Sequence, residues 1–154
     1  MPQGFVHPAN AVVTTSLHGA SPKPCEFEFG AVDTGETPLA GMLVQLSSGL
    51  VILGESGDNI IGFLDVIPDK PRDGDDAPFE LGDQVKVVMG ECVTLLWVNG
   101  AIDEGNFLEP DDDGLAVLQT TGMCCGQALE TSATTTPKKI LVHFFKCPPP
   151  AVSV

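Results

Sequence analysis

Basic and aromatic side chains are both scarce in this chain of 154 residues. It has no Tyr, one Trp and eight Phe, and seven Lys or Arg stand against 21 Asp or Glu, for a formal net charge of −14. Because these few basic residues cannot neutralise a run of phosphates, no nucleic-acid partner is expected. The acidity is explained by solubility and resistance to self-association, with a dedicated cation site as the alternative.

Long hydrophobic runs are also missing. The longest uncharged apolar run, Cys92 to Val98, is far too short to span a bilayer, so no membrane partner is expected. Residues 1–8 have neither a basic nor an apolar region of the kind that directs export. A chain made without export keeps its thiols in a reducing compartment. We therefore predict that the five cysteines are mostly free and buried.

Signatures of catalysis and of metal binding are absent from the sequence. It has no phosphate-binding Gly loop and no Gly-x-Ser-x-Gly elbow, and its three histidines are scattered. Cys124 and Cys125 are adjacent, so on a strand they would point to opposite faces. The run Asp111-Asp-Asp-Gly114 invites a calcium interpretation, but Leu115 falls at the third ligand position, which favours a solvated turn. We therefore expect that the protein is not an enzyme and that it binds no metal and no cofactor.

Short β-patterned segments separated by turn residues make up most of the chain. Seventeen Gly and 13 Pro, with apolar residues leaning toward Val, Leu and Ile, are typical of short strands and tight turns. Strands are predicted over 42–46, 50–53, 59–66, 84–89, 92–98, 106–109, 115–118, 123–130 and 139–146. We expect 84–89 and 92–98 to form a hairpin, and 101–108 to be a short helical turn or a strand lead-in. The predicted fold is all-β, with a compact β-barrel or sandwich-like body.

Both ends of the chain differ from this body. Residues 1–36 contain four prolines, which predicts an extended N-terminal arm, although residues 25–30 alternate like a half-buried strand. The arm is expected to become ordered on a partner, and a leader without function is the alternative. Its candidate binding residues are Phe5, Val6, Val12, Val13 and Leu17. The body is assigned to residues 37–146, with an exposed acidic loop at 65–82, and residues 147–154 form a Pro-rich tail.

Two aromatic residues, Trp97 and Phe107, are candidates for contacts between subunits. Trp97 lies in the continuous apolar run of residues 94–98, so both faces of that strand need cover from a core and from a second layer or a neighbouring subunit. Large aromatic residues concentrate at the centres of interfaces. An ordinary place in a β-core is the alternative for Trp97.

The order of segments in the body resembles a known family. A Thr37-Pro-Leu opening, Gly-Met-Leu-Val-Gln-Leu over 41–46, a Ser-Ser-Gly turn, Leu-Val-Ile-Leu over 50–53 and Gly-Asp-Asn-Ile-Ile-Gly-Phe-Leu over 57–64 follow in turn. This order is similar to the opening of the tailed-virus head decoration, or capsid cement, proteins of the lambda type. Later segments, including Gly126-Gln-Ala-Leu-Glu130, fit loosely, so the resemblance covers about residues 37–145. The acidic loop and the cysteines depart from the family pattern.

The resemblance implies a homotrimeric, β-rich structural protein of a virion, whose other partner is the major capsid protein. Such a protein is synthesised in the host cytoplasm, binds the outer surface of an icosahedral capsid and stabilises it. The alternative is a β-barrel binding module or the base of a virion fibre or turret, which contacts a host or a glycan. A small trimeric β-enzyme, such as a nucleotide hydrolase, would need acidic and Ser/Gly motifs that the sequence lacks.

Overall fold

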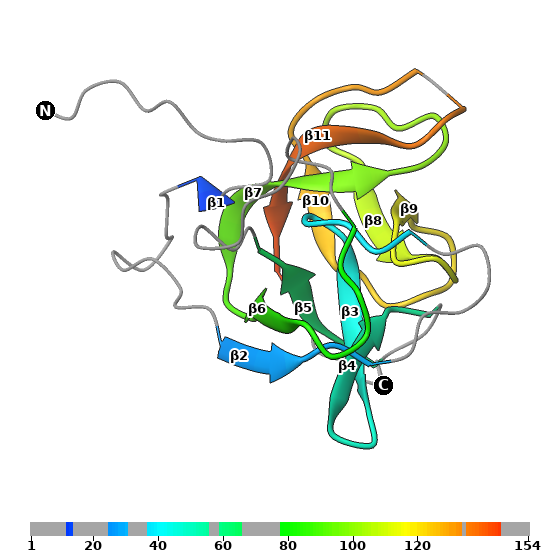
Figure 1. Cartoon of the computed structure of the whole chain (residues 1–154). Helices are drawn as coiled ribbons and strands as arrows, with labels where there is room; N and C mark the ends of the chain where they lie inside the picture. Colours follow the sequence, from blue (N-terminus) through cyan, green and yellow to red (C-terminus); the bar gives the residue numbers. More distant parts are fainter. Residues whose placement is uncertain are drawn as a thin grey trace, which may run out of the picture.

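Eleven strands in two sheets form the described part of the molecule. The structure is a computed structural model that describes residues 12–13, 25–30, 37–55, 59–65, 78–133 and 135–145. Figure 1 shows the six-stranded sheet, here sheet A, above the five-stranded sheet, here sheet B. These residues contain no helix, so the predicted all-β, sandwich-like class is confirmed. Within the described ranges, no helix is long and apolar enough to cross a membrane.

Sheet B is curled so that its two outer strands come back together. It contains β2 (Cys25–Glu28), β3 (Leu43–Ser47), β4 (Leu50–Leu53), β5 (Ile60–Leu64) and β6 (Gln84–Val88), in the antiparallel order β2-β6-β5-β3-β4. A bridge between Phe29 and Val51, with the Gly30 N–H donating to the Val51 carbonyl at 2.6 Å, joins the end of β2 to β4. A Cβ atom on Gly30 would lie 3.0 Å from side-chain atoms of two β4 residues, so the missing side chain permits this approach.

Sheet A closes in a similar way. It contains β1 (Val12–Val13), β7 (Cys92–Val98), β8 (Phe107–Pro110), β9 (Ala116–Leu118), β10 (Gly126–Ala128) and β11 (Lys138–Phe144), in the order β1-β7-β11-β10-β8-β9. Because β9 also pairs with β7 through Val98 and Ala116, the five strands other than β1 form a closed ring. Strand β11 pairs with β7 along its whole length. Strand β1 therefore lies on the same edge of β7 as β9.

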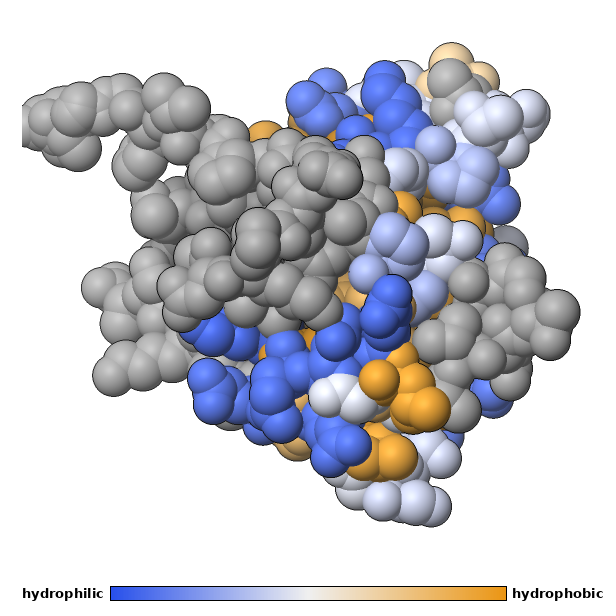
Figure 2. All heavy atoms as spheres, in the orientation of Figure 1, coloured by the Kyte–Doolittle hydropathy of each residue, from blue (hydrophilic) through white to orange (hydrophobic). Residues whose placement is uncertain are grey.

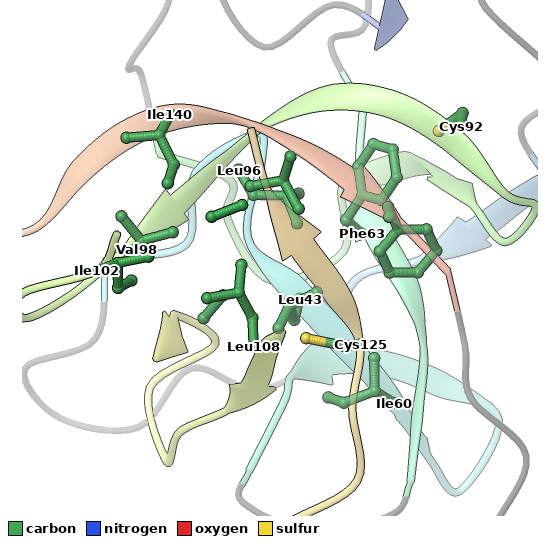
Figure 3. Packing of buried hydrophobic residues seen from close by; sticks show 14 of the residues in the cluster. Leu43, Ile60, Phe63, Cys92, Leu96, Val98, Ile102, Leu108, Cys125 and Ile140 are labelled. Carbon is green, nitrogen blue, oxygen red and sulfur yellow. The ribbon is translucent and has the colours of Figure 1, made fainter. Parts of the chain in front are cut away.

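The core has two parts, one on each face of sheet B. The first lies between the sheets, where Leu43, Ile60 and Phe63 of sheet B belong to one cluster with Leu96 and Ile140 of sheet A (Figure 3). The Phe63 ring meets the ring of Phe144 edge-on, with their centroids 5.0 Å apart. The second part lies on the other face of sheet B, where its buried members are Phe29, Leu39, Ala40, Met42, Val44, Val51, Leu53, Leu64, Phe79, Val85, Val87 and Leu115. Sheet B is therefore covered on both faces.

The expected hairpin of 84–89 with 92–98 is wrong. Strand β6 pairs with β2 and β5 in sheet B, whereas β7 pairs with β1, β9 and β11 in sheet A. The short link at 89–91 carries the chain from one sheet to the other. Val88 and Cys92, on its two sides, are both fully buried in the core between the sheets. The crossing between the sheets allows both side chains to be buried in the core.

Other expectations of the sequence agree with the structure. The first hairpin turns at Ser48 and Gly49, whose φ values of 52° and 82° suit the twist of a two-residue β-hairpin. Residues 101–108 are a strand lead-in, in which Ile102 bridges to Ser132 before β8 begins. The strand expected over 25–30 is present as β2, but it belongs to the body and not to the arm, because it pairs with β6 and is followed by the fully buried Phe29. Phe5, Val6, Leu17, the tail from 147 and most of the 65–82 loop lie outside the described residues.

Candidate interaction surface

The N-terminal segment contributes a strand to sheet A. In β1, Val12 pairs with Thr94 and Val13 with Val93, in the antiparallel sense. Of the five candidate arm residues, these two alone lie in the described ranges. A segment of only two residues has little intrinsic strand stability, so its pairing depends on the edge that β7 offers.

The outer face of sheet A carries a set of apolar side chains. The side chains of β7 alternate, with Cys92, Thr94, Leu96 and Val98 buried in the core and Val93, Leu95 and Trp97 half-buried on the other face. The pairings across β7, β11, β10 and β8 place Val93, His143, Gln127 and Phe107 in one row. Leu95 pairs with Leu141, and the Leu129 N–H donates to the Leu141 carbonyl at 2.9 Å. We call Val93, Leu95, Phe107, Leu129 and Leu141 the outer apolar face.

Two members of the outer apolar face are open to solvent. Phe107 is 48% exposed and Leu129 is 37% exposed. Other large apolar residues, such as Leu46 and Leu81, are exposed elsewhere, and Figure 2 shows apolar residues as separate groups among hydrophilic ones. What distinguishes the outer apolar face is that its members share one side of a continuous sheet, a common property of protein contact surfaces.

A polar pair, His143 and Glu91, interrupts the outer apolar face. His143 Nε2 lies 2.9 Å from Glu91 Oε2, and the His143 ring lies beside that of Phe145, with centroids 4.9 Å apart. The Gln127 side chain, next in the row, donates to the Gly105 carbonyl at 3.1 Å. These contacts hold the polar members of the row in place between Val93 and Phe107. The surface therefore combines apolar area with fixed polar groups.

Trp97 and Phe107 do not meet. Phe107 is level with Val93, which is four residues, or about 13 Å, from Trp97 along β7. The Trp97 indole N–H donates to the Ala40 carbonyl at 3.2 Å, and the Lys139 ammonium lies 5.4 Å from the ring centroid. Trp97 packs against the core cluster on sheet B, whereas Phe107 belongs to the outer apolar face.

A pocket of about 310 Å³ lies beside Trp97. Its walls come from Thr37, Leu39, Met42, Trp97, Leu115 and Pro137, and the exposed Asp113 completes them. Sequence reasoning missed this pocket because its residues come from four separate parts of the chain. The one signal in the sequence was Trp97 itself.

The acidic turn between β8 and β9 is held by the carboxylate of Asp111. Asp111 Oδ1 accepts hydrogen bonds from the N–H groups of Asp113 at 2.8 Å and Leu115 at 2.9 Å. Burial raises the pKa of Asp111 and its charged neighbours raise it further, which outweighs the lowering by these hydrogen bonds. The Asp111 oxygen is therefore committed to the turn itself.

Glu109 fixes the turn after β9. Its carboxylate accepts hydrogen bonds from the N–H groups of Thr120 at 2.9 Å and Gly122 at 2.5 Å. Partial burial raises the pKa of Glu109, but the hydrogen bonds together bring it below its ordinary value. This carboxylate supports the strand end that carries Leu118.

Three of the cysteines, Cys92, Cys124 and Cys125, are buried thiols outside any disulfide, as predicted. Burial, together with the charges of Asp65 and Glu91, raises the pKa of Cys92 to about 12, so its reactive thiolate form is suppressed. The described ranges hold no group of three or more His, Cys, Asp or Glu that could bind a metal ion.

Comparison with known proteins gives little. No family model and no curated protein matches the chain. Among solved structures, the chain is similar to the N base of the head fiber gp8.5 of bacteriophage phi29, with 17% sequence identity and a TM-score of 0.46. The match covers 81% of this chain and 98% of the other. A likeness of this degree does not carry a conclusion about this chain.

Proposed function

We propose that this chain is a capsid decoration, or cement, protein, which binds the outer surface of an icosahedral capsid and stabilises it. The proposal rests on the segment order that resembles such proteins. The observation that carries it is the pairing of β1 with β7, because this short apolar segment ahead of the body forms a strand on a sheet edge. An arm with that capacity can also add a strand to a sheet in another protein.

Attachment then depends on many weak contacts acting together. We propose a homotrimer, with the outer apolar face as the contact between copies and Phe107 and Leu129 at its exposed part. Three arms on one particle bind with a much lower overall dissociation constant than one arm alone, because the second and third binding steps are intramolecular. The major capsid protein is the proposed partner.

Co-sedimentation with capsids tests the proposal. The intact chain is expected to sediment with expanded capsids and less with unexpanded ones, because a ligand favours the state that it binds better. Deletion of residues 2–24 is expected to abolish retention but leave a folded body, since β2 begins at Cys25 and Phe29 stays in place. Equal decoration by the truncated chain would contradict the role of the arm.

A finer variant pair isolates strand formation. Replacing Val12 and Val13 by Pro removes two backbone donors and is expected to reduce retention strongly, whereas Thr at both positions keeps strand propensity and is expected to retain binding. If the intact chain binds no capsid but binds a host surface glycan, the fibre or turret base becomes the better account.

A further inference from the structure

We propose that the pocket beside Trp97 binds the side chain of a lysine or arginine that a partner protein presents. The inference goes beyond capsid attachment, because it concerns a defined pocket and a class of side chain. It applies to any protein partner of this chain, so it can fail or succeed independently of the decoration role.

The walls of the pocket suit the aliphatic stem of such a side chain. Leu39, Met42 and Leu115 are each less than one-tenth exposed, and Trp97 adds an aromatic wall. Ligand pockets usually measure about 300–1,000 Å³, so a pocket of about 310 Å³ is at the lower limit. One long side chain fits this space better than a large organic ligand does. Lysine and arginine both carry apolar stems that pack on such surfaces.

The polar groups of the pocket suit a cationic head. Asp113 supplies a carboxylate, which only accepts hydrogen bonds when ionised, and among the described residues no cation pairs with it. The indole N–H of Trp97 is already used by the Ala40 carbonyl. The charge of Asp111 next to Asp113 adds to the negative potential, in a chain whose net charge is −14. A ligand that donates hydrogen bonds and carries positive charge therefore complements the pocket.

The position of Lys139 determines where in the pocket the cationic head group of the ligand binds. Its ammonium lies 5.4 Å from the centroid of the Trp97 ring, so that ring already has a cation beside it. The incoming head group is therefore expected at Asp113, with its stem against Leu39, Met42 and Leu115. This arrangement makes Asp113 the residue that selects charge.

The chain carries its own reporter for this site. Trp97 is the single Trp and there is no Tyr, so Trp emission, and the one indole N–H signal in an NMR spectrum, both come from the pocket wall. The full chain is titrated with acetyl-Gly-Arg-Gly-amide and with its Lys, norleucine and Glu counterparts. We expect a saturable response to the Arg and Lys peptides, and at least about tenfold weaker binding of the norleucine and Glu peptides, because only the cation meets Asp113.

Two variants identify the group responsible. Asp113→Asn is expected to weaken Arg-peptide binding about fivefold to tenfold, the effect of one partly exposed charge-assisted contact. The turn should persist in this variant, because it is held by the Asp111 carboxylate and the backbone N–H of Asp113. Asp103→Asn makes the same change in net charge at an exposed residue that does not line the pocket, and is expected to leave binding within about twofold.

Three outcomes would overturn the proposal. They are no saturable response of either Trp97 signal to the Arg peptide, equal affinity for the norleucine peptide, and equal binding by Asp113→Asn. None of these measurements uses a capsid, so their failure is separate from failure of the decoration role.

Discussion

Replacing Phe107 by Ala is expected to weaken contacts between copies of the chain. An aromatic side chain buries roughly 200 Å², and with 48% of Phe107 exposed, about 100 Å² remains for a partner to cover. At about 25 cal/mol per Å², covering that area contributes about 2.5 kcal/mol for each subunit. A loss of this size corresponds to a dissociation constant about 60-fold higher.

Sedimentation equilibrium measures this association directly. The buried half of the Phe107 ring also supports folding, so the free energy of unfolding of the variant is measured separately and association is compared where the protein is fully folded. Leu81→Ala is the matched control, since Leu81 is 69% exposed but lies in the loop before β6, outside the outer apolar face. If both variants associate like the original chain, or if both weaken equally, the outer apolar face is not the contact.

Four further predictions follow from the described residues. Thr94 Oγ1 is buried without a hydrogen-bond partner, so Thr94→Val is expected to raise the free energy of unfolding by about 1 kcal/mol in chemical denaturation; a decrease would refute this. Because the folded-state pKa of Asp111 is raised, its charge lowers stability at neutral pH. Asp111→Asn should therefore raise the melting temperature at pH 7, by an amount that shrinks as the pH falls through the folded pKa. An increase that does not change with pH would contradict this reasoning. The folded-state pKa of Glu109 is lowered, so its contribution to stability is present above its unfolded pKa and is lost as the pH falls through the folded one. Glu109→Gln should therefore lower the melting temperature at pH 7, by a difference that shrinks as the pH falls through the folded pKa; a difference that does not change with pH would contradict this. Cys92 should resist alkylation in the native protein and react after unfolding, as mass spectrometry of the unreduced protein will show; rapid native labelling would contradict its burial.

Local features of the fold could be predicted from the sequence because local chemistry determines them. The Ser-Ser-Gly turn lies between two apolar runs, and the acidic turn at 111–114 separates β8 from β9. The sequence does not distinguish a hairpin from a crossing at 89–91, because a short Gly-containing link between two strands suits both. The crossing is favoured because it buries Val88 and Cys92 together between the sheets.

Contacts between distant segments had no local signal. The bridges of Phe29 to Val51 and of Val98 to Ala116 close the two sheets, yet each joins residues that are far apart in sequence. The site shows the same limit. Trp97 and Phe107 stood out by residue type, but the part played by Leu129 emerges only from the pairing of β10 with β11.

Genome release on heating tests the central claim most directly. A protein that binds the expanded capsid stabilises that state by mass action. Particles stripped of this protein are expected to keep their shape but to release their genome at a lower temperature than decorated particles, and adding the purified chain back should restore the original curve. Identical release curves with and without the protein would contradict a cement function.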